Sequence, residues 1–222
     1  YVIYLVKIYI LICFLPAIFV WFFFNNLSKV KHLLLRISLV PVVLIVVSFL
    51  SYFTVSEITE ENQKYSKSTL IKTAEITALD NSLWTVRKEG SGYSLGDYDF
   101  SLTGLLRKFI PAVWVTLYRP YLWEADNPMM VLSSIESLGM LLLTVSLLFA
   151  HGLFRAVRYS FTKPFVVFCL LFTISFAFAV GVSSGNFGSL VRYKIPLMPF
   201  FISSLFIINY YAKSVKNLQL SK

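Results

Sequence analysis

The chain has 222 residues, of which 57% are hydrophobic and 14% are charged, and its mean hydropathy is +0.73. Soluble domains have about 45–50% apolar and about 25% charged residues, so this composition excludes an ordinary soluble domain and indicates a membrane protein. The chain opens at Tyr1 within an apolar stretch and shows no signal-peptide amino-terminal region. We therefore expect a C-terminal fragment of a longer polytopic protein.

Apolar segments long enough to cross a bilayer occur five times. A helix needs about 20 such residues to cross the ~30 Å hydrocarbon core. The segments lie at 3–24, 37–55, 129–150, 165–183 and 195–211. They predict an all-α polytopic fold, a single membrane domain over residues 1–222 with about five transmembrane helices. Residues 56–127 would form an extracytoplasmic insertion between the second and third spans.

Basic residues are concentrated after the first, third and fifth predicted spans, where no acidic residue occurs. They are Lys29, Lys31, Arg36, Arg155, Arg158, Lys163, Lys213, Lys216 and Lys222. Alternating spans place these segments on one side, which the positive-inside rule makes cytoplasmic, with the C-terminus inside and 56–127 outside. Elsewhere the numbers of basic and acidic residues are equal, so the net charge of +9 comes from these nine residues. We therefore interpret it as a sign of the topology in a cytoplasmic membrane. This pattern predicts contact with membrane lipids and excludes nucleic acid as the partner.

The segment "SLTGLLRKFIPAVWVTLY", residues 101–118, has helical periodicity. Its apolar side chains recur at intervals of three and four residues, and Ser101 or Asp99 can cap its start. With Arg107 and Lys108 on the polar face, it predicts an interfacial amphipathic helix on the outer leaflet. A helix packed over the spans is the alternative.

The connection "YRPYLWEADNP", residues 118–128, contains the first candidate site residues. Prolines interrupt the helix on both sides and predict a short, rigid segment at the membrane surface. Glu124 or Asp126 could act as a general base or metal ligand beside an outer active site. Alternatively, the two acids serve the start of the next helix and Arg119 pairs locally.

Glu136 lies within the third predicted span, among the serines of "LSSIESLGM". A carboxylate inside a membrane costs about 2.5–3.5 kcal/mol on insertion scales, so we expect it to face the bundle interior and to find a partner. The residue would line a substrate path or form a polar contact between spans.

The segment "SSGNFGSLVRYKIPLMPF", residues 183–200, predicts a glycine-rich outer loop that leads into the last span. Arg192 and Lys194 stand on the side where positive residues are disfavoured. A guanidinium fork and an ammonium suit a phosphate ligand, and snorkelling at a helix end is the alternative. Pro196 falls near the start of the span, and Pro199 can bend its first turn.

The Arg-Tyr-x-x-Pro-x-x-Pro pattern of "NFGSLVRYKIPLMPF" resembles the C-terminal region of bacterial multi-span GT-C-type glycosyltransferases and polysaccharide polymerase-like membrane proteins. The resemblance implies an outer-face reaction on a polyprenyl-phosphate-linked sugar in cell-surface glycan assembly. It also implies that Arg192 and Lys194, and more weakly Arg119, contact the lipid phosphate. GT-C enzymes place a catalytic carboxylate in their first outer loop, which this chain lacks. That acid is expected upstream of Tyr1, or Glu124 or Asp126 takes its role.

Two other functions fit the same sequence. Glu136 and Lys7 would line the path of a transporter or flippase, whose proline-broken helices rearrange. A non-catalytic membrane assembly subunit would use 56–127 to dock a partner. No metal or cofactor is expected, because Cys13 and Cys169 lie in separate apolar runs without ligand spacing. The sequence does not define an oligomeric state.

Overall fold

The chain is helical over the part that a computed structural model describes. That part comprises residues 8–27, 72, 75, 76, 79, 92–95, 101–161 and 163–220. Within it, the only β pairing is one isolated bridge between Gly92 and Asn186. Three helical runs are long and apolar enough to cross a membrane: Pro128–His151, Pro164–Ser184 and Phe187–Ser214. The prediction of an all-α fold with membrane-spanning helices is confirmed to this extent.

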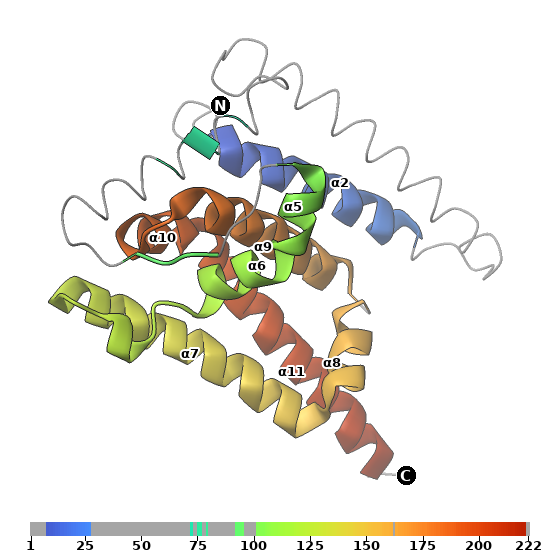
Figure 1. Cartoon of the computed structure of the whole chain (residues 1–222). Helices are drawn as coiled ribbons and strands as arrows, with labels where there is room; N and C mark the ends of the chain where they lie inside the picture. The colour runs from blue at the N-terminus through green and yellow to red at the C-terminus, as the bar shows by residue number, and fades with distance from the viewer. Residues whose placement is uncertain are drawn as a thin grey trace.

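Helices occupy four of the five predicted spans (Figure 1). They are α2 (Ile8–Leu27), α7 (Pro128–His151), α9 (Pro164–Ser184) and α11 (Met198–Leu220). The apolar part of α2, Ile10–Asn26, is shorter than the three runs that could cross a membrane. The second predicted span, 37–55, lies outside the described residues, as does about half of the 56–127 insertion. The total of five spans therefore stays a prediction.

Helix α9 forms the centre of the bundle. It contacts α2, α6, α10 and α11, and it is the most buried of the three long apolar runs. Phe14 of α2 and Phe200 of α11 meet Phe172 of α9 in edge-on contacts, with ring centroids 5.3 Å and 4.9 Å away. Such aromatic pairs add specific geometry to apolar burial. Helices α2 and α11 are therefore held together by side chains that project from α9.

Residues 101–118 form two helices instead of one. They are α5 (Leu102–Arg107), which Ser101 caps as predicted, and α6 (Phe109–Tyr118). The buried face of α6 packs on α9, and Thr116 Oγ1 donates to the Ala177 carbonyl of α9 at 2.8 Å. The structure thus supports the alternative of a helix packed over the spans. A position on the outer leaflet stays a prediction.

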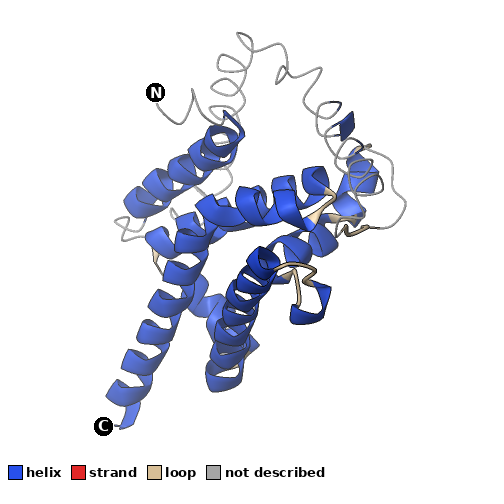
Figure 2. Ribbon diagram, turned by 90° about the vertical axis from the view of Figure 1, so that its left-hand side faces the viewer, coloured by secondary structure: helices blue, strands red, loops and turns tan. Residues whose placement is uncertain are grey.

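The expected glycine-rich loop before the last span is mostly helical, which corrects the prediction. Gly185 ends α9 in the left-handed conformation (φ 65°), and the Asn186 side chain caps α10 (Phe187–Lys194) by accepting from Ser189 N. The 3₁₀ turn η3 (Ile195–Leu197) then leads into α11. Figure 2 shows α11 as a long helix that runs to the C-terminal end. Only Gly185 and Asn186 lie between α9 and α10.

The short helix α8 (Leu153–Ser160) lies at the opposite end of the bundle from α10 (Figure 1). It contacts α7, α9 and α11. Helix α8 contains Arg155 and Arg158 of one predicted basic segment, and α11, which contacts α8, contains Lys213 of another. The bundle therefore has one end with α8 and these basic residues, and another end with α10 and the 119–127 connection.

The contact between α6 and α9 gives a testable prediction. A Cβ on Gly181 would lie 2.3 Å from the Ala112 carbonyl oxygen, so Gly181→Ala must push α6 away from α9. Overpacking of this kind costs about 1–3 kcal/mol, and we expect a lower melting temperature in detergent. Gly139→Ala is the matched control, because no atom lies within 4 Å of its added Cβ. Equal melting temperatures for the two variants would contradict the close contact.

Candidate functional site

The connection between α6 and α7 is as short and as well defined as its prolines predict. After α6 ends at Tyr118, a cis peptide joins Arg119 to the buried Pro120. The 3₁₀ turn η2 (Leu122–Glu124) follows, and the Asn127 side chain caps α7 by accepting from Met130 N at 2.9 Å. The chain thus holds Arg119 and Glu124 within one compact turn.

Arg119 and Glu124 form a two-point ion pair. Arg119 Nε donates to Glu124 Oε2 at 3.0 Å, and a second guanidinium nitrogen donates to Oε1. The backbone N–H of Tyr121 also donates to Oε2, at 2.8 Å. The guanidinium stands 4.9 Å from the centre of the Phe187 ring of α10. The Arg119 guanidinium is therefore held by two hydrogen bonds to the Glu124 carboxylate and by the face of the Phe187 ring.

The Glu124 carboxyl is ionised at neutral pH. Partial burial would raise its pKa, but the hydrogen bonds from Arg119 and from the Tyr121 N–H, together with the charge of Arg119, outweigh this effect. The pKa consequently lies below its ordinary value. Three donors already point at its two oxygens, so Glu124 serves as a structural ion-pair partner and is not a free base. The alternative in which Arg119 pairs locally is the one observed.

Lys194 has no exposed surface and connects three parts of the chain. Its Nζ donates to Ser137 Oγ of α7 at 2.6 Å and to the Arg119 carbonyl at 3.1 Å. Ser137 Oγ is also within reach of the Ser133 carbonyl, at 2.9 Å. Glu136 is near enough for its charge to act on the ammonium. A buried ammonium needs such acceptors, and here they tie the end of α10 to α7 and to the connection.

The other predicted site residues stand at the surface. Arg192 is exposed, and its Nε donates to the Gly188 carbonyl of its own helix at 3.0 Å. Asp126 is exposed as well. Glu136 is exposed instead of facing the interior, which corrects that expectation, although its charge reaches Lys194. The residues of the Arg-Tyr-Lys segment therefore separate into an outward Arg192 and an inward Lys194.

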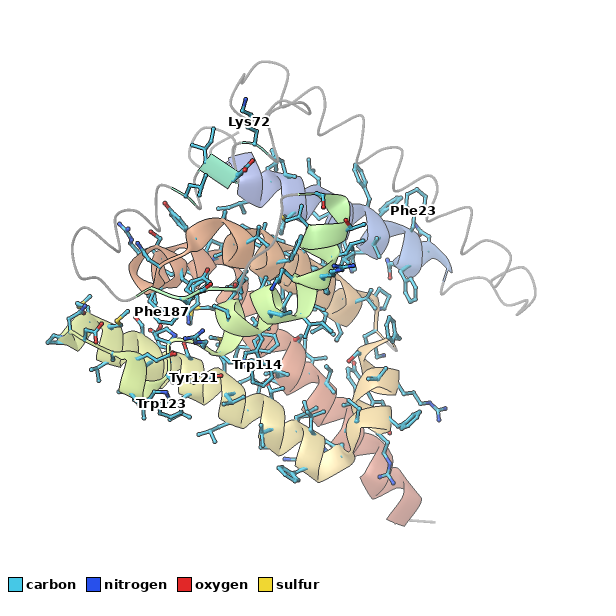
Figure 3. The ribbon with its side chains drawn as sticks, viewed as in Figure 1. Phe23, Lys72, Trp114, Tyr121, Trp123 and Phe187 are labelled. Carbon is cyan, nitrogen blue, oxygen red and sulfur yellow. The ribbon has the colours of Figure 1, made fainter. Side chains whose placement is uncertain are left out.

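The structure thus brings Arg119, Glu124 and Lys194 together and adds Phe187 and Ser137, to which sequence reasoning gave no role of their own. Figure 3 shows Phe187, Tyr121 and Trp123 in the same part of the molecule, with Phe23 toward the other end. Tyr121 stacks on Trp123 and accepts a hydrogen bond from Trp114 Nε1 at 2.9 Å. Among the described residues, no group of three His, Cys, Asp or Glu side chains is placed to hold a metal ion.

Comparison with known proteins gives no relative from which a role could be carried over. No protein-family model, curated protein or solved structure matches the chain. The roles of the site residues consequently rest on the geometry described above.

The buried contact between Lys194 and Ser137 is expected to stabilise the fold. Ser137→Ala leaves the ammonium short of an acceptor, which costs about 1–3 kcal/mol for a buried group. Lys194→Met removes the charge at similar volume, so the double variant should lose less stability than the sum of the two single variants. Thermal unfolding in detergent measures this coupling, with Ser146→Ala, an exposed serine of α7, as control. Strictly additive losses would show that the two residues act independently.

The ion pair of Glu124 predicts a pH dependence. Because its pKa is lower in the folded chain, the pair contributes stability above the ordinary carboxyl pKa of about 4.3. This contribution falls as the pH drops from there through the folded-state pKa. The difference in melting temperature between the parent chain and Glu124→Gln should therefore shrink below about pH 4.3. A difference for Glu124→Gln that stays constant across this pH range would overturn the assignment.

Proposed function

We propose that the chain is the membrane part of a GT-C-type glycosyltransferase that uses a polyprenyl-phosphate-linked sugar in cell-surface glycan assembly. One observation carries the proposal. The segment that resembles this family and the acidic connection at 119–126 are far apart in sequence, yet Lys194 binds the Arg119 carbonyl directly. An exposed cation and an exposed carboxylate, Arg192 and Asp126, thereby belong to elements that are fixed to each other.

The geometry favours different roles for the three candidate cations. Arg192 is exposed and is the cation that a lipid phosphate can reach. Arg119 is held by Glu124, and Lys194 is enclosed, so we assign both to positioning. Side chains that the fold holds in this way are suited to keeping a neighbouring exposed group in place.

In the proposed reaction an acceptor hydroxyl attacks the anomeric carbon of the sugar. The new C–O bond forms as the bond to the phosphate oxygen breaks, and the electron pair leaves with the polyprenyl phosphate. The hydroxyl proton passes to the Asp126 carboxylate. Arg192 stabilises the charge that develops on the leaving phosphate, which is the usual use of a guanidinium in such a step.

The proposal also includes the membrane topology. In a five-span arrangement the end with α8 and the basic residues would face the cytoplasm, and the end with α10 and residues 119–127 would face outward. The C-terminus would be cytoplasmic, in a bacterial cytoplasmic membrane. The opposite placement of α8 and α10 along the bundle supports this orientation.

The test measures binding and transfer by the full-length protein in membrane vesicles. We expect Arg192→Ala to weaken binding of polyprenyl phosphate by about tenfold or more, because one charge-assisted hydrogen bond is worth about 1.5–3 kcal/mol. Polyprenol, which lacks the phosphate, should bind equally to both forms. Arg107→Ala removes an exposed cation from α5 and serves as control. Transfer from labelled polyprenyl-phosphate sugars should fall in parallel.

Two results would contradict the proposal. If Arg192→Ala leaves both binding and transfer unchanged, the phosphate is not held by this residue. If the parent protein binds polyprenyl phosphate and moves it across the bilayer without forming a glycan product, the function is transport of the lipid carrier instead.

A further inference from the structure

A groove lies at the other end of the bundle from the candidate site, where α2, α9 and α11 meet. Its volume is about 540 Å³, within the range of small-molecule sites. Trp21 of α2, Phe165 of α9 and Tyr210 of α11 form part of its wall, and each is substantially exposed. The wall is thus largely aromatic and open to the surroundings of the bundle.

The polar part of the groove is positively charged. Lys163, at the start of α9, lines it, and its Nζ stands 4.6 Å from the centre of the Tyr211 ring. This contact fixes the ammonium at the edge of the apolar wall. Among the described residues, no side chain caps the amino-terminal end of α9, so the positive end of a 21-residue helix adds to the same field. Asn25 contributes an amide beside it.

The helices that form the groove contain no acidic residue that could neutralise this charge. The α2 sequence has no Asp or Glu, and none follows Glu136 anywhere in the chain. Further cations stand nearby on α8 and α11, among them the exposed Arg155 and Lys213. The positive charge of the groove therefore favours an anionic ligand. Its aromatic wall favours a ligand that also has hydrocarbon chains.

We propose that this groove binds an anionic diacyl phospholipid. Its phosphate would accept hydrogen bonds from Lys163 and lie before the start of α9, and its acyl chains would lie along Trp21, Phe165 and Tyr210. Basic pockets between transmembrane helices recognise anionic headgroups by this chemistry. The site lies apart from Arg192 and Asp126, so it does not depend on the proposed transfer reaction.

Bromine quenching of Trp21 tests the proposal in the full chain. The reporter variant keeps Trp21 and replaces Trp84, Trp114 and Trp123 by Phe. The protein is reconstituted in phosphatidylcholine vesicles that contain an equal fraction of either dibrominated phosphatidylglycerol or dibrominated phosphatidylcholine. We expect the anionic lipid to associate with Trp21 about fivefold more strongly, as one cation at a membrane surface predicts.

Three variants separate a specific site from general surface charge. Lys163→Gln should abolish the preference, Lys163→Arg should keep it, and Arg155→Gln should keep it although it removes a charge from the same end. Equal quenching by the two lipids in the reporter chain would overturn the proposal. The same holds if Lys163→Gln retains the preference, or if Arg155→Gln reduces it as much.

Native mass spectrometry of the chain with all four tryptophans is a second measurement that does not depend on the reporter. Phosphatidylglycerol should stay bound to the parent protein and to Arg155→Gln at collision energies that strip it from Lys163→Gln. Loss of the lipid from all three proteins at the same energy would also overturn the assignment.

Discussion

The enclosure of the Lys194 ammonium is the interaction on which the arrangement of this end of the bundle depends. An ammonium removed from water without acceptors costs several kcal/mol, so the chain must bring oxygens to it. The structure does so with Ser137 Oγ and the Arg119 carbonyl, which belong to α7 and to the connection before it. Since Lys194 ends α10, satisfying one charge fixes three segments relative to one another. The position of Glu124 follows, because it is paired to Arg119.

This arrangement explains why neighbouring cations can differ in role. Arg192 and Lys194 are two residues apart, and side chains at that spacing on a helix point in widely different directions. Phe187, Leu190 and Lys194 share the buried face of α10, which leaves Arg192 outside. Burial makes Lys194 a structural contact, and exposure leaves Arg192 available to a ligand. Glu124 and Asp126 differ in the same way, because Glu124 is partly buried beside Arg119 and Asp126 is exposed.

The helices were easier to predict than the contacts. The segments 129–150 and 165–183 differ by one residue at each end from α7 and α9, because hydropathy and length define an apolar helix and Asn127–Pro128 and Gly185 mark its limits. The side chain of Lys194 is buried because α10 is a helix. The glycines of this segment predict a loop instead, so the direction of the side chain could not be predicted. Ser133 and Ser137 lie four residues apart on the buried face of α7, a spacing that could have indicated the contact with Lys194. Glu136 beside them points elsewhere.

The two ends of the bundle differ in whether their cations have partners within the fold. At the α10 end, Arg119 has a carboxylate partner and Lys194 has oxygens within the fold. At the α8 end, the sequence after Glu136 supplies cations without carboxylates, so α8, α9 and α11 cannot neutralise each other's charge. A membrane protein can keep such an excess where the surrounding leaflet provides the counter-charge. The distribution of acids along the chain, more than that of the cations, therefore distinguishes the α10 end, where Glu124 pairs with Arg119, from the α8 end, where α8 and α11 have cations and no carboxylate.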